Sequence, residues 1–341
     1  MSMKTGEKVY HARRAVAELF NISAAERLVF TKNTTEALNM GLHGFLENGD
    51  HVITTSMEHN SVLRPLKAME KEGISHSIVK GNKRGEINPQ DIERAIKSNT
   101  SLIVVTAASN VTGTKMPLKE MGGIARKNGI AFMVDGAQGA GTMNLNVEEL
   151  NIDMLALPGH KGLLGPLGTG ALYVSPYIKL SSTQQGGTGT ESKSRVQPEE
   201  FPEGFESGTI NAPAIIGLGY SAGFIKKIGL DVIGDYEEEL IACLDERLMN
   251  MDFISLYGPE PSKKTGISLI NIDGMEAEEV TSVLNSKYGI AVRGGYHCAG
   301  LAHKTVGTWG TGGVRISVGP FNSKKDIERL TDALWEIGRN R

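Results

Sequence analysis

The chain has 341 residues, of which 40% are hydrophobic and 22% are charged, and its formal net charge is −3. This length and apolar content exclude a wholly disordered chain and predict two domains. Because no apolar run approaches the roughly 18 residues that cross a bilayer and the N-terminus lacks the apolar core of a signal peptide, we expect a cytoplasmic protein that binds neither membrane nor nucleic acid.

The first half of the chain alternates predicted strands and predicted helices. The patterns predict helices over 8–20 and 117–128 and strands over 28–30, 51–55, 101–109, 130–134 and 154–157. This alternation is typical of a mostly parallel sheet flanked by helices.

Residues 33–36, Asn-Thr-Thr-Glu, open one of the apolar helical segments. One interpretation is a capping box, in which side chains satisfy the first free N–H groups of the helix. The other is a phosphate site, because two hydroxyls and a helix N-terminus together favour an anion. The spacing alone favours the cap.

The second half begins with a long polar segment over 181–204, rich in Gly, Ser, Thr and Glu, which predicts a loop. The elements predicted after it are a helical pattern over 213–250 interrupted near Gly229, helices over 276–287 and 324–337, and strands over 266–272, 290–293 and 313–318. We therefore expect a large α/β domain over 1–225 and a smaller α+β domain over 226–341.

The chain contains only two cysteines, Cys243 and Cys298. Two are too few for a disulfide framework or a cysteine-built zinc site, and we predict no metal. Cys243 falls at an apolar position of the long helical pattern, which indicates a small buried side chain. Cys298 lies in a glycine-rich segment and is open to a chemical role.

Asp135 and Lys161 each follow a predicted buried strand. In an open α/β sheet, ligands bind beyond the carboxyl ends of the strands, so both side chains are expected in one crevice. A lysine amine can form a Schiff base with pyridoxal phosphate, and an aspartate beside the pyridine nitrogen keeps that nitrogen protonated. An aspartate after a strand is more often a turn residue, so the surrounding motifs decide between the two interpretations.

Those motifs resemble a known family. VDGAQ at 134–138, GHK at 159–161 and GPLGTGALYV at 165–174 are similar to the cofactor region of class V aminotransferase-fold enzymes, in particular the cysteine desulfurases and selenocysteine lyases. The similarity extends, motif by motif, from about residue 28 to residue 322. It implies the fold of the fold-type I pyridoxal phosphate enzymes and pyridoxal 5'-phosphate as the cofactor.

The resemblance also implies roles for individual residues. Thr34 and Thr35 match the pair that holds the cofactor phosphate, and His59 matches the histidine that stacks on the pyridine ring. The further cofactor residues that it implies are Asn110, which also faces the substrate, Gln138, His160 and, through a neighbouring subunit of a homodimer, Thr209. Many relatives carry a serine two places before the histidine of GHK, whereas this chain has Pro158.

The segment AVRGGYHCAGLAHK places Arg293 and His297 close to Cys298. Both could favour the thiolate, which is the nucleophilic form of cysteine. Relatives carry their sulfur-accepting cysteine in such a loop, so the resemblance implies that Cys298 is a catalytic nucleophile. Arg315 matches the residue that binds the substrate carboxylate through its planar guanidinium, and Arg293 is a secondary candidate.

We therefore expect a cysteine desulfurase that converts L-cysteine to L-alanine and leaves the sulfur on Cys298 as a persulfide, for transfer to an acceptor protein. Lys161, Cys298 and His59 are the predicted catalytic residues. Three alternatives stay open: a selenocysteine lyase, another class V aminotransferase or lyase with Cys298 as a bystander, and an inactive member of the fold. The last arises because the chain starts without the Leu-Asp-Asn-Ala-Ala-like segment with which relatives usually begin.

Overall fold

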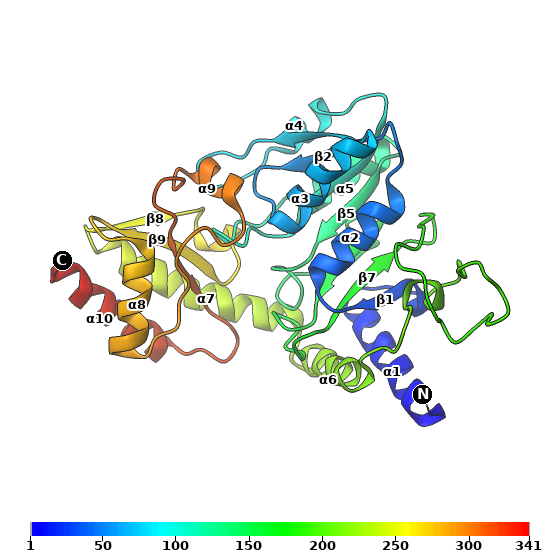
Figure 1. Cartoon of the computed structure of the whole chain (residues 1–341). Helices are drawn as coiled ribbons and strands as arrows, with labels where there is room; N and C mark the ends of the chain where they lie inside the picture. Colours follow the sequence, from blue (N-terminus) through cyan, green and yellow to red (C-terminus); the bar gives the residue numbers. More distant parts are fainter. Residues whose placement is uncertain (1, 341) are drawn as a thin grey trace.

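The structure is a computed structural model that describes residues 2–340. Its elements form two units, each built around its own sheet (Figure 1). The larger unit contains a seven-stranded sheet and the smaller a three-stranded sheet. Within residues 2–340, no helix is long and apolar enough to cross a membrane.

The large sheet is mostly parallel, as predicted. Its strands lie in the order β1 (Leu28–Thr31), β7 (Gly170–Val174), β6 (Met154–Pro158), β5 (Ala131–Asp135), β4 (Thr100–Thr106), β2 (His51–Thr55) and β3 (Ser75–Val79). Only β7 runs antiparallel to its neighbours, and every other pairing is parallel. The carboxyl ends of β2, β4, β5 and β6 therefore meet along one edge.

Helices cover both faces of this sheet, which explains why its central strands read as unbroken apolar runs. The residues of β4 alternate between the two cores: Ile103 and Val105 face one cluster, while Leu102 and Val104 face the other. The first cluster includes side chains of α1 (Met3–Leu19), α4 (Pro89–Arg94), α5 (Leu118–Lys127) and α6 (Ala212–Ile228). The second includes side chains of α2 (Thr34–Phe45) and α3 (Asn60–Met69).

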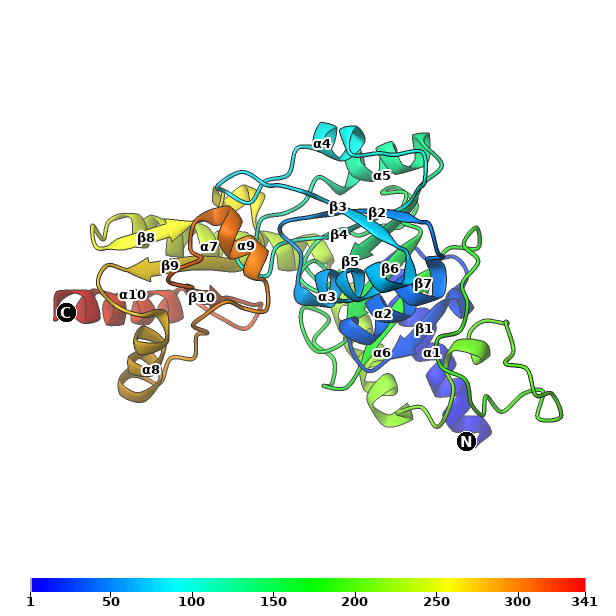
Figure 2. The ribbon, with the colours of Figure 1, turned by 45° about the horizontal axis from the view of Figure 1, so that its top comes forward.

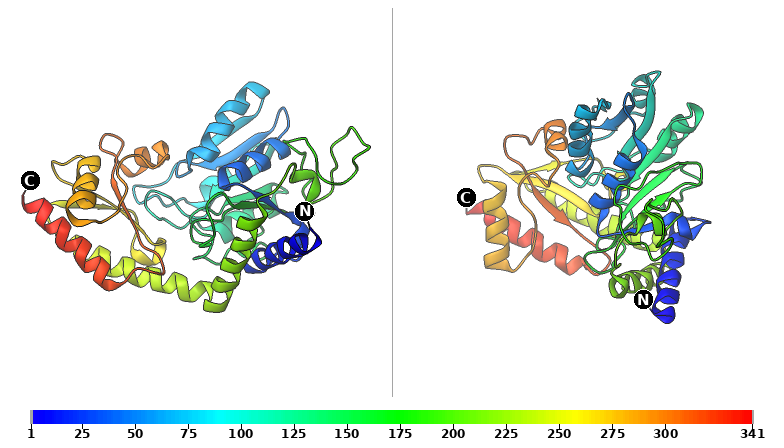
Figure 3. Two further views of the ribbon diagram at one scale, coloured as in Figure 1. Left: turned by 60° about the horizontal axis from the view of Figure 1, so that its bottom comes forward. Right: turned by 45° about the vertical axis from the view of Figure 1, so that its right-hand side comes forward.

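The small unit packs helices against an antiparallel sheet. The sheet order is β10 (Val314–Ser317), β9 (Ile267–Ile272) and β8 (Ile254–Tyr257), and the helices on it are α7 (Leu230–Met249), α8 (Ala277–Tyr288) and α10 (Lys324–Arg339). The short helix α9 (Gly300–Val306) instead buries Ala302 and Val306 in the first core cluster of the large unit. Helix α7 runs from the large unit into the small one, and the N- and C-terminal ends of the described chain lie at opposite ends of the molecule (Figures 2 and 3).

The long helical pattern is interrupted where the sequence predicts it. Helix α6 ends at Ile228 and α7 begins at Leu230, because Gly229 has a φ of 100° that few other residues adopt. The junction lies three residues beyond the proposed domain boundary, and the division into 1–225 and 226–341 stays a prediction.

One predicted strand is wrong. Residues 290–293 form only a single bridge, in which Arg293 and Arg315 exchange backbone hydrogen bonds of 3.1 and 2.8 Å. The pairing does not continue as a strand because Gly294 and Gly295 follow at once, the latter with a φ of 98°. The predicted helix over 8–20 begins earlier, at Met3.

Candidate active site

A cavity of about 190 Å³ lies at the carboxyl ends of the central strands. It brings together most of the residues singled out from the sequence. Its polar lining consists of Asn33, Thr34, Thr35, His59, Ser61, Thr106, Asn110, Asp135, Gln138, His160 and Lys161. Ser61 and Thr106 were not predicted, since neither belongs to a motif.

The N-terminus of α2 forms one side of this cavity. The Asn33 side chain caps the helix by accepting a hydrogen bond of 2.9 Å from the backbone N–H of Glu36. The reciprocal half of the predicted capping box is displaced by one residue, because the Glu36 carboxylate accepts from the backbone N–H of Lys32 rather than that of Asn33. Within the described chain, the N–H groups of Thr34 and Thr35 have no hydrogen-bond partner, so this end of the helix can receive an anion.

His59 caps the next helix, α3, with its ring. The backbone N–H of Ser61 donates to His59 Nδ1 at 3.1 Å, and the Ser61 hydroxyl lies 2.8 Å from the same atom. Because a backbone N–H can only donate, Nδ1 carries no proton and the neutral ring carries its proton on Nε2. Burial, reinforced by the charge of Lys161, lowers the pKa of His59 to about 4. The ring is therefore neutral at physiological pH.

Asp135 and Lys161 approach the cavity from adjacent strands. Asp135 ends β5, is 2% exposed and accepts a hydrogen bond of 2.9 Å from the backbone N–H of Ala137. Burial raises the pKa of the Asp135 carboxyl and lowers that of the Lys161 amine, and the two charges counteract these shifts. The pair thus provides a buried carboxylate and an amine that is more easily deprotonated than a free lysine.

Glu58 is a second buried acid close to Asp135. The Thr55 hydroxyl donates to Glu58 Oε1 at 2.6 Å, whereas Oε2 is buried without a hydrogen-bond partner. Burial raises the pKa of the Glu58 carboxyl to about 8, and the charge of Asp135 adds to the effect. Glu58 is therefore a neutral acid at physiological pH.

The small unit contributes to the site through Arg315 and the loop around Cys298. Arg315 donates from Nη1 to the backbone oxygen of Asn110 at 2.9 Å, and the Asn110 amide donates to the backbone oxygen of His297 at 2.6 Å. Asn110 Oδ1 and Arg315 Nε are buried without hydrogen-bond partners. An acceptor and a donor are thus left for a ligand at the junction of the units.

Cys298 is exposed, and its Sγ lies 3.9 Å from Nη2 of Arg293. The backbone N–H of Asn60 donates to the Cys298 oxygen at 2.8 Å, which ties this loop to the large unit. His297 is not the cation that the sequence suggests. Its ring is buried, and burial lowers its pKa to about 4, so the positive charge near the sulfur at neutral pH comes from Arg293 and from Arg315, which also interacts electrostatically with Cys298.

Of the three remaining predicted residues, two line the cavity and one lies outside it. Gln138 and His160 line the cavity without a hydrogen-bond partner within residues 2–340. Thr209 lies elsewhere, in a separate cavity of about 410 Å³ that also includes Phe30 and Lys32.

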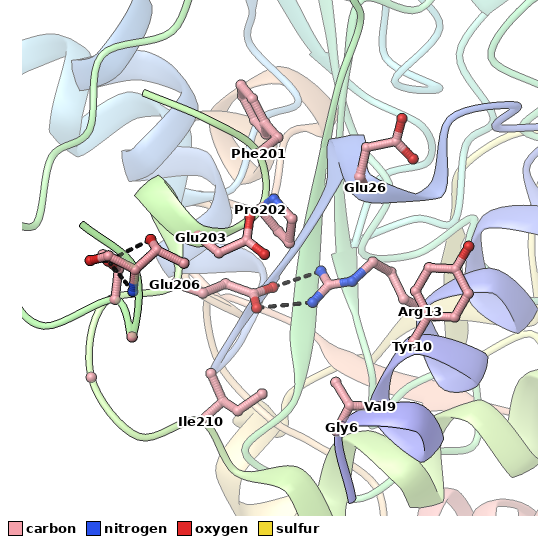
Figure 4. A pocket seen from close by; sticks show the side chains of 14 residues that line it. Gly6, Val9, Tyr10, Arg13, Glu26, Phe201, Pro202, Glu203, Glu206 and Ile210 are labelled. Carbon is pink, nitrogen blue, oxygen red and sulfur yellow. Dashed lines mark hydrogen bonds and ion pairs between the residues drawn. The ribbon is translucent and has the colours of Figure 1, made fainter. Parts of the chain in front are cut away.

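A still larger cavity, of about 530 Å³, lies between α1 and the loop over 188–210 (Figure 4). Two of its charged residues, Arg13 and Glu206, form a two-point pair with distances of 2.7 and 2.9 Å, and Glu206 also accepts from the backbone N–H of Phe30. Because these charges satisfy each other and none of the predicted residues lies there, the smaller cavity around Lys161 is the better candidate for an active site.

Comparisons with known proteins show the family of the chain. The family model described as aminotransferase class-V matches residues 1–330. A probable cysteine desulfurase of Methanothermobacter thermautotrophicus is 37% identical, with 98% of this chain and 85% of that protein covered. A cysteine desulfurase of Salmonella agona is 32% identical, with 99% and 84% covered.

Solved structures lead to the same group. The apo structure of a cysteine desulfurase from Thermococcus onnurineus superposes with a TM-score of 0.94 at 34% identity, covering 100% of this chain and 86% of that one. The Escherichia coli cysteine desulfurase CsdA, in an S-sulfonic acid form, gives a TM-score of 0.90 at 26% identity, covering 98% and 86%.

Proposed function

The chain belongs to the aminotransferase class-V family, and from this we propose that it is a pyridoxal phosphate-dependent cysteine desulfurase that takes sulfur from L-cysteine onto Cys298. The observation that carries the proposal is the loop of the small unit, which brings an exposed thiol, flanked by Arg293, to the junction with the large unit. The relatives named cysteine desulfurase support the same reaction class.

The residues of the cavity fit the cofactor. The free N–H groups of Thr34 and Thr35 and the two hydroxyls, of which that of Thr35 also contacts Ser61 at 2.8 Å, suit its phosphate, and His160 lines the same cavity. Asp135 suits the ring nitrogen, His59 the ring face, and Asn110 and Gln138 the ring oxygen. When bound to Lys161, pyridoxal phosphate supplies a sink for the electrons released at the substrate's Cα.

This chain's own residues then orient the substrate and move its proton. The Arg315 guanidinium, whose Nε is unpartnered, suits the α-carboxylate of L-cysteine, with Arg293 as a second cation nearby. The Lys161 amine, with its lowered pKa, takes the Cα proton. Neutral His59, which lines the same cavity, has Nε2–H available as a donor.

The sulfur step forms one bond and breaks another. The Cys298 thiolate bonds to the substrate sulfur, the Cβ–S bond breaks, and its electron pair stays with carbon, which takes up a proton and leaves as alanine. Cys298 keeps the sulfur as a persulfide until an acceptor thiol removes it. Selenocysteine would suit the same geometry.

We also propose that the chain acts as a homodimer. Thr209, the residue predicted to reach a neighbouring subunit's phosphate, lies outside the cavity of its own chain. Sedimentation of the full chain tests this, and a monomer that holds the cofactor tightly would contradict it.

The function is tested by product release from L-cysteine with a reductant present, comparing the wild type with Cys298→Ala after both are loaded with cofactor. We expect equal amounts of alanine and sulfide from the wild type and neither from the variant. Turnover that survives Cys298→Ala would instead favour another lyase or an aminotransferase of the same family.

A further inference from the structure

Three buried side chains form a hydrogen-bonded chain directly behind the Cys298 loop. His297 Nε2 lies 3.1 Å from the backbone oxygen of Arg293, His297 Nδ1 lies 3.2 Å from His303 Nε2, and His303 Nδ1 lies 2.7 Å from the Thr308 hydroxyl. The three side chains are between 0% and 3% exposed. His303 and Thr308 come from α9 and the turn after it, beside the junction of the two units (Figure 1).

The proton in each of these three hydrogen bonds can be assigned from the chemistry of the donors and acceptors. The Arg293 oxygen is a carbonyl and can only accept, so His297 Nε2 carries a proton and donates it. Neutral His297 therefore accepts at Nδ1, which requires that His303 Nε2 donates. His303 then accepts at Nδ1, and only the Thr308 hydroxyl is there to donate.

The surroundings keep both rings neutral. The charged groups that face His297 are Arg315 on β10 and Arg293 on its own loop, and both disfavour an imidazolium. His303 packs against the His297 ring at 5.4 Å and against the edge of Tyr296 at 5.3 Å, and no carboxylate within residues 2–340 contributes to its pKa. Burial lowers the pKa of each ring to about 4.

The loop in front of these rings has an unusual backbone. His297 and Cys298 have φ values of 52° and 58°, in the left-handed region that residues other than glycine rarely occupy. Two such residues in succession persist only where the surroundings hold them. The large unit holds their carbonyl oxygens through Asn110 and Asn60, and the His297 ring is held from behind by His303.

We propose that His303 and Thr308 are positioning residues for the sulfur-accepting thiol: by fixing the ring of His297, they hold Cys298 in its left-handed conformation beside Arg293. The proposal rests on the proposed function only in taking Cys298 as the acceptor. Because the chain of hydrogen bonds ends on a carbonyl oxygen, it delivers no proton to Cys298, so these residues are not catalytic.

The first test needs no substitution. Long-range ¹⁵N–¹H spectra of the full chain, with ¹⁵N-labelled histidine, report which nitrogen carries the proton in each ring. We expect Nε2–H, with Nδ1 bare, for both His297 and His303 across the neutral pH range. An imidazolium or an Nδ1–H form of either ring would overturn the proposal.

The second test removes the last donor of the hydrogen-bonded series, the Thr308 hydroxyl, and keeps the shape of the side chain. Thr308→Val lacks the hydroxyl, and Thr308→Ser keeps it as the matched control, both in a Cys243→Ala background so that Cys298 is the only thiol. The loss of one buried donor predicts about a tenfold change in the rate of Cys298 alkylation by iodoacetamide, with an altered pH dependence, for the valine variant alone.

Turnover gives an independent readout. With L-cysteine, Thr308→Val should lower kcat about tenfold while cofactor affinity stays unchanged, and Thr308→Ser should restore it. Alkylation that is the same in wild type, Thr308→Val and Thr308→Ser would overturn the proposal. If Thr308→Val does not fold, His303→Gln, which keeps an N–H toward His297, must retain the wild-type alkylation rate while His303→Leu loses it. Alkylation and tautomers are measured without turnover, so a failure of the desulfurase function would not be mistaken for a failure of this proposal.

Discussion

At the residue scale, the site is made of groups whose protonation is set by burial. Asp135 and Lys161 shift toward neutrality in the cavity, and His59 is held neutral with its Nδ1 occupied by Ser61. These shifts follow from removing charge from water, with nearby charges as the smaller cause. Burial also raises the pKa of Glu58, which makes the stability of the protein depend on pH.

Glu58 should make stability fall as pH rises. Its pKa is about 8 in the folded chain against an ordinary value of 4.5, so between these pH values the folded state holds a proton that the unfolded state has released. The free energy of unfolding of the wild type should therefore decrease by a few kcal/mol from pH 5 to pH 8 relative to Glu58→Gln, which cannot ionise. Denaturant unfolding at both pH values measures this, with exposed Glu72→Gln as the control. Parallel pH dependences of wild type and Glu58→Gln would contradict it.

Substrate binding should depend on the shape of the Arg315 side chain as well as on its charge. Arg315→Lys keeps a cation but loses the planar fork that pairs with a carboxylate, so KM for L-cysteine should rise about tenfold or more. Steady-state kinetics of the loaded protein check this, with exposed Arg195→Lys in the polar loop as the control. An unchanged KM would show that another residue, such as Arg293, binds the carboxylate.

The sequence predicts the site residues that directly follow strands. It does not predict the residues that reach the site only through tertiary packing. Asp135 and Lys161 could be predicted to meet because parallel strands end at one edge of the sheet. Ser61, His303 and Thr308 belong to no chemical motif, and their partners are set by how α3 and α9 pack. The neutral state of His297 likewise depends on burial, which a glycine-rich segment does not reveal.

At the element scale, strand β7 and helix α2 are packed closely enough to fix the anion-binding end of the cavity. A Cβ added at Gly170 would lie 2.8 Å from the Cα of Asn33, the capping residue of α2. Gly170→Ala should displace this helix end and weaken pyridoxal phosphate binding about tenfold. Fluorescence titration of the apo protein measures the affinity.

The matched control is Gly123→Ala on α5, where an added Cβ meets no atom within 4 Å. It should leave cofactor affinity unchanged and raise stability by about 1 kcal/mol, the usual gain of alanine over glycine in a helix. Equal cofactor affinities of the two variants would contradict the link between β7 and α2.

Most helices and strands were predicted, including the four-residue strands β1 and β10, whereas two strands without a clear pattern were missed. The strands of the parallel core are apolar runs between turn residues, and α6 and α7 have a clear break at Gly229. Strand β7 was not predicted, because its sequence follows directly on a glycine-rich motif, and β8, whose residues are all half-buried, has no clear pattern. The segment over 290–293 has a strand-like composition, but the glycines after it leave it as a single bridge.

At the scale of the whole molecule, the small unit is tied to the large one through the turn after β4. The backbone N–H of Thr265 donates to the backbone oxygen of Gly113 at 2.9 Å, and the backbone N–H of Lys115 donates to the backbone oxygen of Lys263 at 2.9 Å. Next to these contacts, buried Lys264 pairs with Asp245 at 2.5 Å and contacts Ser268 at 3.0 Å. The pair thus holds the segment on which the two units meet.

Breaking this pair should destabilise the protein more than removing it entirely. Asp245→Leu leaves the ammonium of Lys264 buried without its partner and should cost about 3–5 kcal/mol, whereas the double variant Lys264→Met/Asp245→Leu should recover much of that loss. A double-mutant cycle by denaturant unfolding measures the difference. Additive losses would contradict the coupling of the two charges.

The two-unit architecture and the family follow from the sequence, whereas the assembly of the site across the two units does not. The fold could be predicted because periodicity and motifs are local features of the sequence. The bonds from Asn110 and Asn60 to the Cys298 loop join residues far apart in the chain and exist only in the folded molecule.

The central claim, that Cys298 accepts sulfur from L-cysteine, is tested most directly by mass spectrometry of the cofactor-loaded chain after a single exposure to L-cysteine without reductant. We predict that the peptide containing Cys298 gains the mass of one sulfur atom, in an amount equal to the alanine formed, and that added thiol removes it. Alanine formation with no sulfur on Cys298 would contradict the account.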